Sequence, residues 1–415
     1  MTNQAKQFDV VVIGGGASGM MSAIIAAQNG KRVVLLEKNK SLGKKLDITG
    51  GGRCNITNAE FDTKKLLTVY GDAAPFLYSP FSQFSVQDTF DFFESRGLPL
   101  VVQGLKRSFP KTEKATDVTN LFKKELEKLG VDVRTETRVK KTLHNGKIIT
   151  GVETSKGIFV GSSYILATGG LSHPETGATG DGFSFLKELG HTVKDPTPSI
   201  VPLAVSDEWV HMLAGKSTSD AKITFLLDGK KQFSKTGKIL FTHFGLSGPT
   251  VLNSAGKVSD FLHAGTVTAT IDICPWDDIG AFEARAIKLF DANKNKNLRT
   301  VFKDLVPTGM GSVLEIHFPD IDFNKKVHSV TKDERKLITR LLKALPVTIT
   351  GLMGFDRAVV ADGGIHLSEV DTKTMRSKKV SNLYITGDLL DINRPSGGYG
   401  LQLCWTTGYV AGRSA

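Results

Sequence analysis

The hydrophobic pattern changes period twice near the start of the chain. Val10–Ile13 is a short β-branched apolar run, which is typical of a strand buried on both faces of a parallel sheet. Helical spacing follows over Ala17–Asn29 and stops at Gly30, and a second apolar run covers Val33–Leu36. This order predicts a strand–helix–strand unit with two parallel strands.

Helical and hairpin patterns alternate through the next part of the chain. Apolar residues at helical spacing predict helices over Ser85–Gly97, Ala115–Leu129 and Asp181–Gly190, each with a glycine at or just after its end. The Asn-Gly pair within His144–Lys147 predicts a tight hairpin in a small sheet that ends at Tyr164–Ala167.

Prolines mark a change of organisation at Asp195–Pro202. Short β-rich runs between turns over 202–271 predict a small antiparallel barrel or sheet, and a polar helical pattern over 281–345 predicts a helical insert. Strand character returns at Val347–Thr350 and again at Leu383–Thr386. Glycine-rich loops lie in both terminal parts of the chain, so the simplest arrangement is one α/β domain built from both ends with the middle inserted.

The loop between the first strand and helix carries the clearest chemistry. Gly14, Gly16 and Gly19 form G-x-G-x-x-G, in which the glycines permit a tight turn, a close phosphate and close helix–strand packing. The helix that follows directs its free N–H groups and positive dipole end at the phosphates. Glu37 ends the second strand, near the spacing expected of a carboxylate that binds a ribose hydroxyl and disfavours a 2′-phosphate. This loop alone does not distinguish an NAD-binding site from an FAD-binding site.

Three further glycine-rich loops predict other places where the backbone comes close to the same ligand. They are Thr49–Asn55, Ala167–Gly170 and the segment from Gly387 to Gly400, which leads into a predicted apolar helix over Leu401–Ala411. The candidate cofactor-binding residues are Gly14, Gly16, Ala17, Ser18, Gly19, Glu37, Lys38, Lys45, Thr49, Gly51, Gly52, Arg53, Cys54, Asn55, Ala167, Thr168, Gly169, Gly387, Asp388, Gly397, Gly398, Tyr399, Gly400 and Leu401.

Two histidines in glycine-rich loops, His173 and His243, are the candidates for a catalytic role, and a loop or core histidine is the alternative for each. The three cysteines are far apart and form no C-x-x-C, so a redox-active dithiol is unsupported. The sequence shows no metal-binding pattern and no Ser-His-Asp constellation.

The chain of 415 residues has a net charge of +11. Its lysines are scattered, which favours a solvated basic surface over a nucleic-acid site. No apolar run approaches the roughly 18 residues of a membrane span, and no secretory signal precedes the first strand. We therefore expect a cytoplasmic protein that binds neither membrane nor nucleic acid.

Together these motifs resemble the BaiN-like (also called YhiN-like) NAD(P)/FAD-dependent oxidoreductases, flavoproteins of the two-dinucleotide-binding-domain class. The stretches that carry the resemblance are Gly14–Gly19, Thr49–Asn55, Phe109-Pro110 with Lys114-Ala115, Ala167–Gly170, Phe241–Pro249, Thr374-Met375 with Ser377-Lys378, and Gly397–Tyr399. The family usually has Glu at the position of Asp388 and Asn at that of Gly400, and Asn393-Arg394-Pro395 lies in the loop between them. These departures put substrate preference in question rather than FAD binding.

The resemblance implies a Rossmann-like FAD-binding domain formed by both chain ends, with an inserted β-barrel and a small helical subdomain. The expected boundaries are 1–195 and 360–415 for the FAD-binding domain, 196–275 for the barrel, 276–340 for the helical subdomain and 341–359 for the last barrel strand. Family members include an aminoacetone oxidase and a reductase of steroid enones.

The resulting hypothesis is an FAD-dependent oxidoreductase that moves a hydride between flavin N5 and a small organic substrate. There is no second complete G-x-G-x-x-G for a bound nicotinamide nucleotide, which favours oxidation of a small, aminoacetone-like amine with O2 giving H2O2. The first alternative is NAD(P)H-dependent reduction of an activated C=C bond, with NAD(P)H bound transiently. The second is an RNA-binding or tRNA-modifying flavoprotein. The substrate and the oligomeric state stay open.

Overall fold

The computed structural model describes residues 6–415, which form two compact units. Unit 1 consists of the chain up to Thr197 together with Val359–Ala415, and unit 2 is Pro198–Ala358. Each unit has its own cluster of buried apolar side chains. The first unit boundary, after Thr197, falls in the proline-rich stretch, and the second falls after Ala358.

A seven-stranded sheet forms the centre of unit 1. Its strand order is β6-β2-β1-β9-β8-β7, and β18 pairs with β9 in parallel. The strands are β1 (Lys6–Ile13), β2 (Val33–Leu36), β6 (Asp132–Arg134), β7 (Val139–Asn145), β8 (Ile148–Thr154), β9 (Gly157–Leu166) and β18 (Leu383–Ile385).

Four parallel strands of this sheet end at the same level. Ile13 is in register with both Leu36 and Leu166, and Leu166 is in register with Ile385. The loops that follow β1, β2, β9 and β18 therefore leave one edge of the sheet together. In open α/β sheets, ligands bind outside this carboxyl edge.

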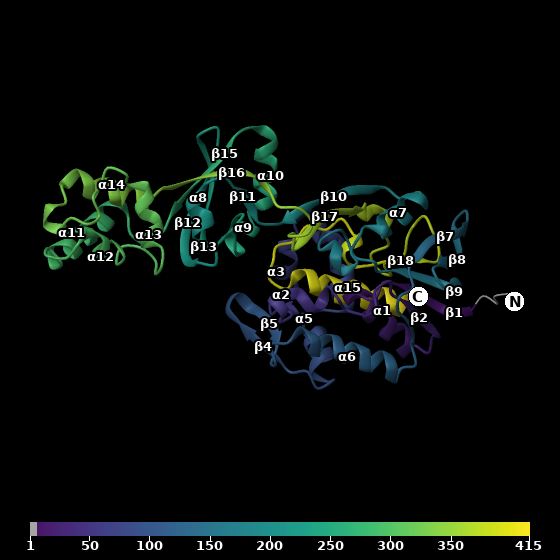
Figure 1. The fold of residues 1–415 in the computed structure, drawn as a ribbon. Coiled ribbons are helices and arrows are strands. Elements are labelled where there is room, and N and C mark those ends of the chain that lie inside the picture. The colour runs from purple at the N-terminus through teal and green to yellow at the C-terminus, as the bar shows by residue number, and fades with distance from the viewer. Residues whose placement is uncertain (1–5) are drawn as a thin grey trace. The chain divides into compact units, whose positions relative to one another are not determined.

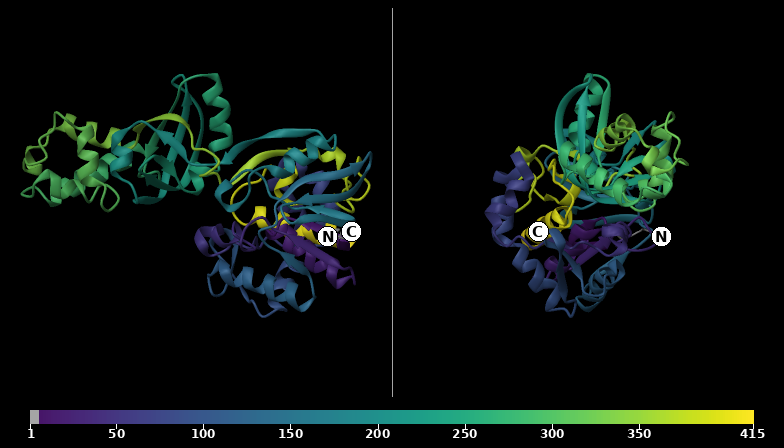
Figure 2. Two further views of the ribbon diagram at one scale, coloured as in Figure 1. Left: turned by 45° about the vertical axis from the view of Figure 1, so that its right-hand side comes forward. Right: turned by 90° about the vertical axis from the view of Figure 1, so that its left-hand side faces the viewer.

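Two helices from opposite ends of the chain pack closely on each other. They are α1 (Ala17–Gln28) and α15 (Tyr399–Ser414), which lie side by side in Figures 1 and 2. A Cβ at Gly408 would lie 2.6 Å from the backbone oxygen of Ser18, and one at Gly412 would lie 2.4 Å from that of Ser22. The two glycines, one helical turn apart, thus allow backbone contact between the helices.

Buried aromatic rings hold α15 against two further helices, α5 (Val86–Glu94) and α6 (Ala115–Lys128). Trp405 stacks on Phe122 with a centroid distance of 5.2 Å and makes an edge contact with Phe93. The other elements of unit 1 are α2 (Thr49–Gly52), α3 (Thr63–Leu67), α4 (Ala74–Gln83), α7 (Asp181–Glu188), a sheet of β3 (Thr57–Asn58), β5 (Arg107–Pro110) and β4 (Leu100–Gln103), and the pair formed by β10 (Val193–Ile200) and β17 (Val360–Ile365).

Unit 2 contains a closed barrel with the strand order β11-β14-β13-β12-β15-β16, and Figure 1 shows its helices α11–α14 beside it. Apolar side chains alternate inward along its strands, as at Ile223 and Phe225, which are fully buried. The strands are β11 (Leu203–Val205), β12 (Ser217–Leu227), β13 (Lys230–Thr242), β14 (Gly245–Ser247), β15 (Val267–Asp272) and β16 (Leu345–Leu352). The helices are α8 (Glu208–Met212), α9 (Pro249–Leu252), α10 (Ala255–Ala264), α11 (Ile279–Ala292), α12 (Leu298–Phe302), α13 (Gly311–Leu314) and α14 (Lys332–Leu342).

The predicted α/β fold with an inserted barrel is confirmed. The finer division of the insert into barrel and helical subdomain stays a prediction. Two local features were not predicted. The stretch 41–58, expected to be a loop, contains α2 and β3. The helices α3 and α4 were missed because their apolar residues do not recur with a regular helical period. No helix of the described residues is both long and apolar enough to cross a membrane.

Candidate functional site

The three glycines of the first loop have different surroundings. A Cβ at Gly14 would lie 2.4 Å from the backbone oxygen of Ala167, and one at Gly19 would lie 1.9 Å from that of Gly14. A Cβ at Gly16 would meet nothing within 4 Å. Gly14 and Gly19 are therefore required by packing, whereas the space beside Gly16 is open at the N-terminus of α1, where a phosphate fits.

Glu37 is fixed against this loop by backbone groups. Its Oε2 accepts a hydrogen bond from Gly15 N at 2.8 Å, and its Oε1 accepts one from Asn39 N at 2.7 Å. The residue is buried with 8% exposure. A carboxylate oxygen has two acceptor positions, so this geometry leaves room for ribose hydroxyls.

Two lysines near this loop, Lys38 and Lys45, form ion pairs with carboxylates of the same chain. Lys38 Nζ lies 3.0 Å from Asp181 Oδ2, and Lys45 Nζ lies 3.3 Å from Asp388 Oδ2 and also bonds Ser172. Lys45 therefore joins the loop after β2 to the loop after β18. Its contribution to cofactor binding, like that of Lys38, stays a prediction.

The Thr49–Asn55 loop combines open glycines with buried side chains. Gly51 and Gly52 have positive φ, and no atom lies within 4 Å of the Cβ position of either. The Arg53 guanidinium stacks on the Phe109 ring at 4.4 Å. Burial raises the pKa of the Cys54 thiol to about 12, so this cysteine is a neutral packing residue at physiological pH.

Asn55 links this loop to the C-terminal one. With its amide nitrogen facing the carbonyls of Thr57 and Ser108, its oxygen accepts a hydrogen bond from Gly398 N at 3.0 Å. Gly398 itself has φ +101°, and a Cβ there would lie 2.3 Å from the carbonyl carbon of Thr57. Two loops more than 300 residues apart in sequence are thereby held together by backbone contact.

The loops after β9 and β18 are also in contact. Ala167 N donates to Ile13 O at 2.9 Å, and a Cβ at Gly170 would lie 3.3 Å from the Asp388 backbone oxygen. Ser18 Oγ accepts a hydrogen bond from the Thr386 hydroxyl at 3.1 Å. The structure therefore brings the predicted Ala17–Gly19, Ala167–Gly169 and Gly387–Asp388 segments to one place, next to β1.

The start of α15 completes this edge. Gly387 N donates to Thr407 Oγ1 at 3.0 Å, and Tyr70 Oη donates to Tyr399 O at 2.9 Å. Leu401 and Gly400 lie in the first turn of the helix, whose leading N–H groups have no partner within the helix. The first turns of α1 and α15 each offer such donors to an anionic or carbonyl-bearing ligand.

The two candidate histidines lie in different units. His173, in unit 1, has φ +54°, and its Nδ1 bonds Glu175 Oε1 at 2.8 Å. His243, in unit 2, is exposed and makes an edge contact with the Phe244 ring. A catalytic role for either one stays a prediction.

A serine–histidine–glutamate constellation is present that the sequence did not reveal. His191 Nε2 lies 3.0 Å from Ser377 Oγ, and His191 Nδ1 lies 2.9 Å from Glu369 Oε2. Ser377 Oγ also accepts hydrogen bonds from the backbone N–H groups of Lys379 and Val380. Because Ser377 is 3% exposed and its acceptor positions are filled, this network ties segments together rather than attacking a substrate.

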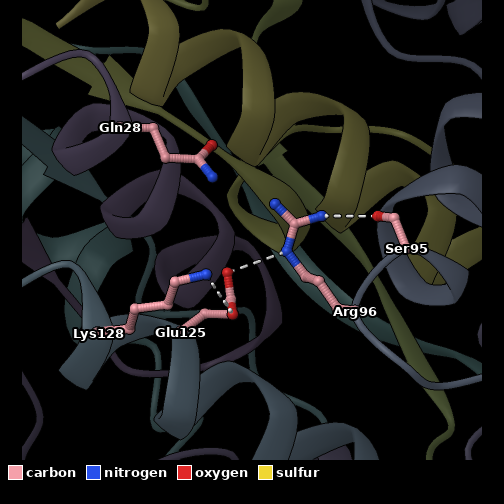
Figure 3. Close-up of a pocket in the computed structure, with 5 residues that line it drawn as sticks. All are labelled: Gln28, Ser95, Arg96, Glu125 and Lys128. Carbon is pink, nitrogen blue, oxygen red and sulfur yellow. Dashed lines mark hydrogen bonds and ion pairs between the residues drawn. The ribbon is translucent and has the colours of Figure 1, made fainter.

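A polar cleft of about 400 Å³ is lined by Gln28, Ser95, Arg96, Glu125 and Lys128 (Figure 3). Arg96 Nε lies 3.2 Å from Glu125 Oε2, and Lys128 Nζ lies 3.9 Å from Glu125 Oε1, so its charges are paired with each other. Gln28 ends α1, so the cleft lies at the far end of that helix from Gly16, about 18 Å away. It does not belong to the predicted cofactor site.

The residues present fit FAD. The open space beside Gly16 suits a pyrophosphate, and the fixed Glu37 suits a ribose. The open space beside Gly51 and Gly52 leaves room for another part of FAD to come close to the backbone.

Comparison with known proteins agrees with this reading. The family model described as the HI0933-like protein Rossmann domain matches residues 8–414. The 3-dehydro-bile acid delta(4,6)-reductase of Clostridium scindens is 32% identical over 97% of this chain and 98% of its own. The ribosomal RNA dihydrouridine synthase of Escherichia coli is 28% identical over 98% of this chain and 97% of its own.

The fold is shared with solved flavoenzymes. The 3-ketosteroid-delta4-(5alpha)-dehydrogenase of Rhodococcus jostii RHA1 has a TM-score of 0.55 and 15% identity, and the match covers 100% of this chain and 98% of that one. The protein is an oxidoreductase with FAD as its cofactor. With a family match over nearly its whole length, the chain belongs to the HI0933-like Rossmann-domain family.

Proposed function

We propose that this protein reduces a C=C bond conjugated to a carbonyl group, with FAD carrying the hydride. The observation that supports it most is a shared chemistry in the names of two relatives that match almost the full chain. A delta(4,6)-reductase acting on a 3-dehydro bile acid and an enzyme that makes dihydrouridine both saturate a C=C bond near a carbonyl. The proposal therefore favours the reductase alternative over the amine oxidase.

When bound, FAD supplies the hydride chemistry, and the chain supplies position and electrostatics. Gly16 and Glu37 hold the ADP part at the N-terminus of α1. The Thr49–Asn55 loop and the start of α15, joined through Asn55 and Gly398, hold the ring part. The positive end of α15 favours negative charge on the ring.

The test compares electron donors and acceptors on the purified flavoprotein. NADH, NADPH and a panel of primary amines are each added without oxygen, and bleaching of the flavin is followed before air or an enone is admitted. We expect bleaching by a nicotinamide nucleotide and reoxidation by an enone such as a 3-oxo-Δ4 steroid. Fast bleaching by amines followed by peroxide formation in air would instead support the amine oxidase.

RNA is the second substrate candidate, because one relative is named for ribosomal RNA and the net charge is +11. Uridine within RNA contains the same conjugated C=C bond. Binding of ribosomal RNA fragments that weakens steeply with salt would support this candidate. RNA that is not retained even at low salt would leave a small molecule as the substrate.

A further inference from the structure

The hairpin between β4 and β5 presents a leucine to solvent. Leu105 lies at its tip and is 78% exposed, more than any other large apolar side chain in the described part of the chain. Leu105 and the next residue, Lys106, both have positive φ, at +60° and +57°. Residues with side chains rarely adopt this left-handed conformation, and two in succession persist only where the surrounding structure holds them.

Three contacts hold the tip in this conformation. Asn58 Nδ2 donates to Leu105 O at 3.1 Å, and Ala59 N donates to Lys106 O at 2.7 Å. Lys106 Nζ lies 2.5 Å from Glu60 Oε2. The three partners are consecutive in sequence, so one short segment fixes a strained backbone that keeps an apolar side chain in water. Strain of this kind clusters at ligand-binding segments.

The same asparagine ties the tip to the loop before α15. Asn58 Nδ2 also donates to Gly397 O, at 3.3 Å. Because one amide nitrogen bonds both carbonyl oxygens, the backbone of Leu105 and that of Gly397 are neighbours. Gly398 follows as the N-cap of α15, whose start belongs to the proposed site for the ring part of FAD. The exposed leucine is therefore next to the place where the proposed chemistry occurs.

Tyr399, the first residue of α15, adds a hydrogen-bond donor to this place. Its side chain is partly exposed, and its ring carbons lie 3.2 and 3.6 Å from the Cβ position of Gly397. Burial raises the pKa of the Tyr399 hydroxyl and the Glu60 carboxylate raises it further, against the opposing effect of Lys106 and Arg107. The hydroxyl is thus protonated at neutral pH and within electrostatic reach of the hairpin tip.

We propose that the substrate lies between Leu105, which contacts its hydrocarbon part, and Tyr399, whose hydroxyl donates a hydrogen bond to its carbonyl oxygen. The inference rests on the proposed reduction of a conjugated C=C bond and names the substrate class, an enone with a large hydrocarbon skeleton. Burying an exposed leucine against hydrocarbon is favourable, whereas a leucine offers nothing to the phosphates of RNA. The lysine beside it is already paired with Glu60.

The test follows flavin reoxidation in the FAD-loaded full chain, photoreduced without oxygen. The acceptors are a 3-oxo-Δ4 steroid and cyclohexenone, which carries the same enone with little hydrocarbon. Leu105→Ser should raise the steroid concentration that gives half the maximal rate at least about tenfold and leave that for cyclohexenone unchanged. Ile148→Ser is the matched control, because it removes an apolar side chain that is 51% exposed on β8, and it should change neither value.

Leu105→Gly distinguishes binding from a structural role. Glycine adopts positive φ without strain, so this variant should keep or raise the Tm while losing steroid affinity as Leu105→Ser does. Tyr399→Phe should slow reoxidation by both enones at equal FAD content, because both carry a carbonyl oxygen. Wild-type dependence on steroid concentration in the two Leu105 variants would overturn the proposal, and so would equal losses with steroid and cyclohexenone.

Two further outcomes separate this inference from the proposed function. A wild type that is reoxidised by uridine-containing RNA and by neither enone would keep the proposed reaction and overturn the apolar substrate class. A wild type that no C=C substrate reoxidises contradicts the proposed function. Steroid binding to the oxidised protein, followed by the shift of flavin absorbance, then tests the hairpin alone: weaker binding in Leu105→Ser than in Ile148→Ser supports it, and equal binding overturns it.

Discussion

At the scale of single residues, glycines of one motif perform separate tasks. Gly14 and Gly19 are required by neighbouring backbone, whereas Gly16 faces open space and has φ −83°, which any residue adopts. The sequence motif predicts all three, but it does not say which of them serves the fold and which serves the ligand. The surroundings of each Cβ position show that packing requires Gly14 and Gly19 but not Gly16, and we propose that Gly16 serves the ligand.

Gly16→Ala and Gly19→Ala should therefore fail in different ways. Gly16→Ala should leave the Tm of the apoprotein nearly unchanged and weaken FAD binding at least about tenfold, because the methyl group enters the phosphate space. Gly19→Ala should destabilise the protein by roughly 2 kcal/mol or more, because a Cβ overlaps Gly14 O. Thermal unfolding and FAD titration of both variants distinguish these effects. Equal losses of Tm in the two variants would contradict this assignment.

The His191 network should make stability depend on pH. Burial lowers the pKa of His191 below its ordinary 6.5. Burial would raise the pKa of Glu369, but hydrogen bonds from Lys379, His191 and Thr192 outweigh it and lower that pKa from 4.5 to about 2. Both groups contribute stability that is present above their unfolded-state pKa values and lost as the pH falls, first below 6.5 and then between 4.5 and about 2.

His191→Gln should therefore flatten the fall of Tm as the pH decreases below 6.5. Ser377→Ala should cost about 1–3 kcal/mol at pH 7, because it leaves two backbone N–H groups and His191 Nε2 without their partner. Differential scanning measurements across pH test both variants. Tm curves that run parallel for the wild type and His191→Gln would show that another group carries the acid sensitivity.

At the scale of elements, the contact between α1 and α15 joins the segments that we propose hold the ADP end and the ring end of FAD. The glycines at 408 and 412 permit this contact, and the Gln402 side chain anchors the start of α15. Gln402 Oε1 accepts hydrogen bonds from the hydroxyls of Thr57 at 2.6 Å and Thr89 at 3.0 Å. The helix is thus fixed both along its length and near its N-terminus.

Gly408→Val should separate α1 from α15 and lower both stability and FAD affinity. Overpacking of this kind costs about 1–3 kcal/mol. Gly256→Ala in α10 is a suitable control, because a Cβ there meets nothing within 4 Å, and it should leave stability unchanged or slightly raised. Denaturant unfolding and FAD titration provide the measurements. A Gly408→Val protein with normal FAD affinity would show that this contact does not position the site.

At the scale of the whole molecule, the sequence predicted most of unit 1 and the class of unit 2. Strand ends and glycine loops have local sequence signals, so β2, α1 and β18 were placed within a residue, whereas β1 begins four residues before the predicted Val10. Contacts between distant segments were not predictable from one sequence, because no local pattern encodes Asn55 against Gly398 or His191 against Ser377.

The central claim is that reduced FAD in this protein passes its hydride to a C=C bond conjugated to a carbonyl. The most direct measurement mixes photoreduced enzyme, without oxygen, with a 3-oxo-Δ4 steroid and, in parallel, with its saturated analogue. The account predicts that the flavin absorbance returns only with the enone and that the product gains the mass of two hydrogens. Flavin that stays bleached with enones and with uridine-containing RNA, yet reoxidises in air with peroxide formation, would contradict it.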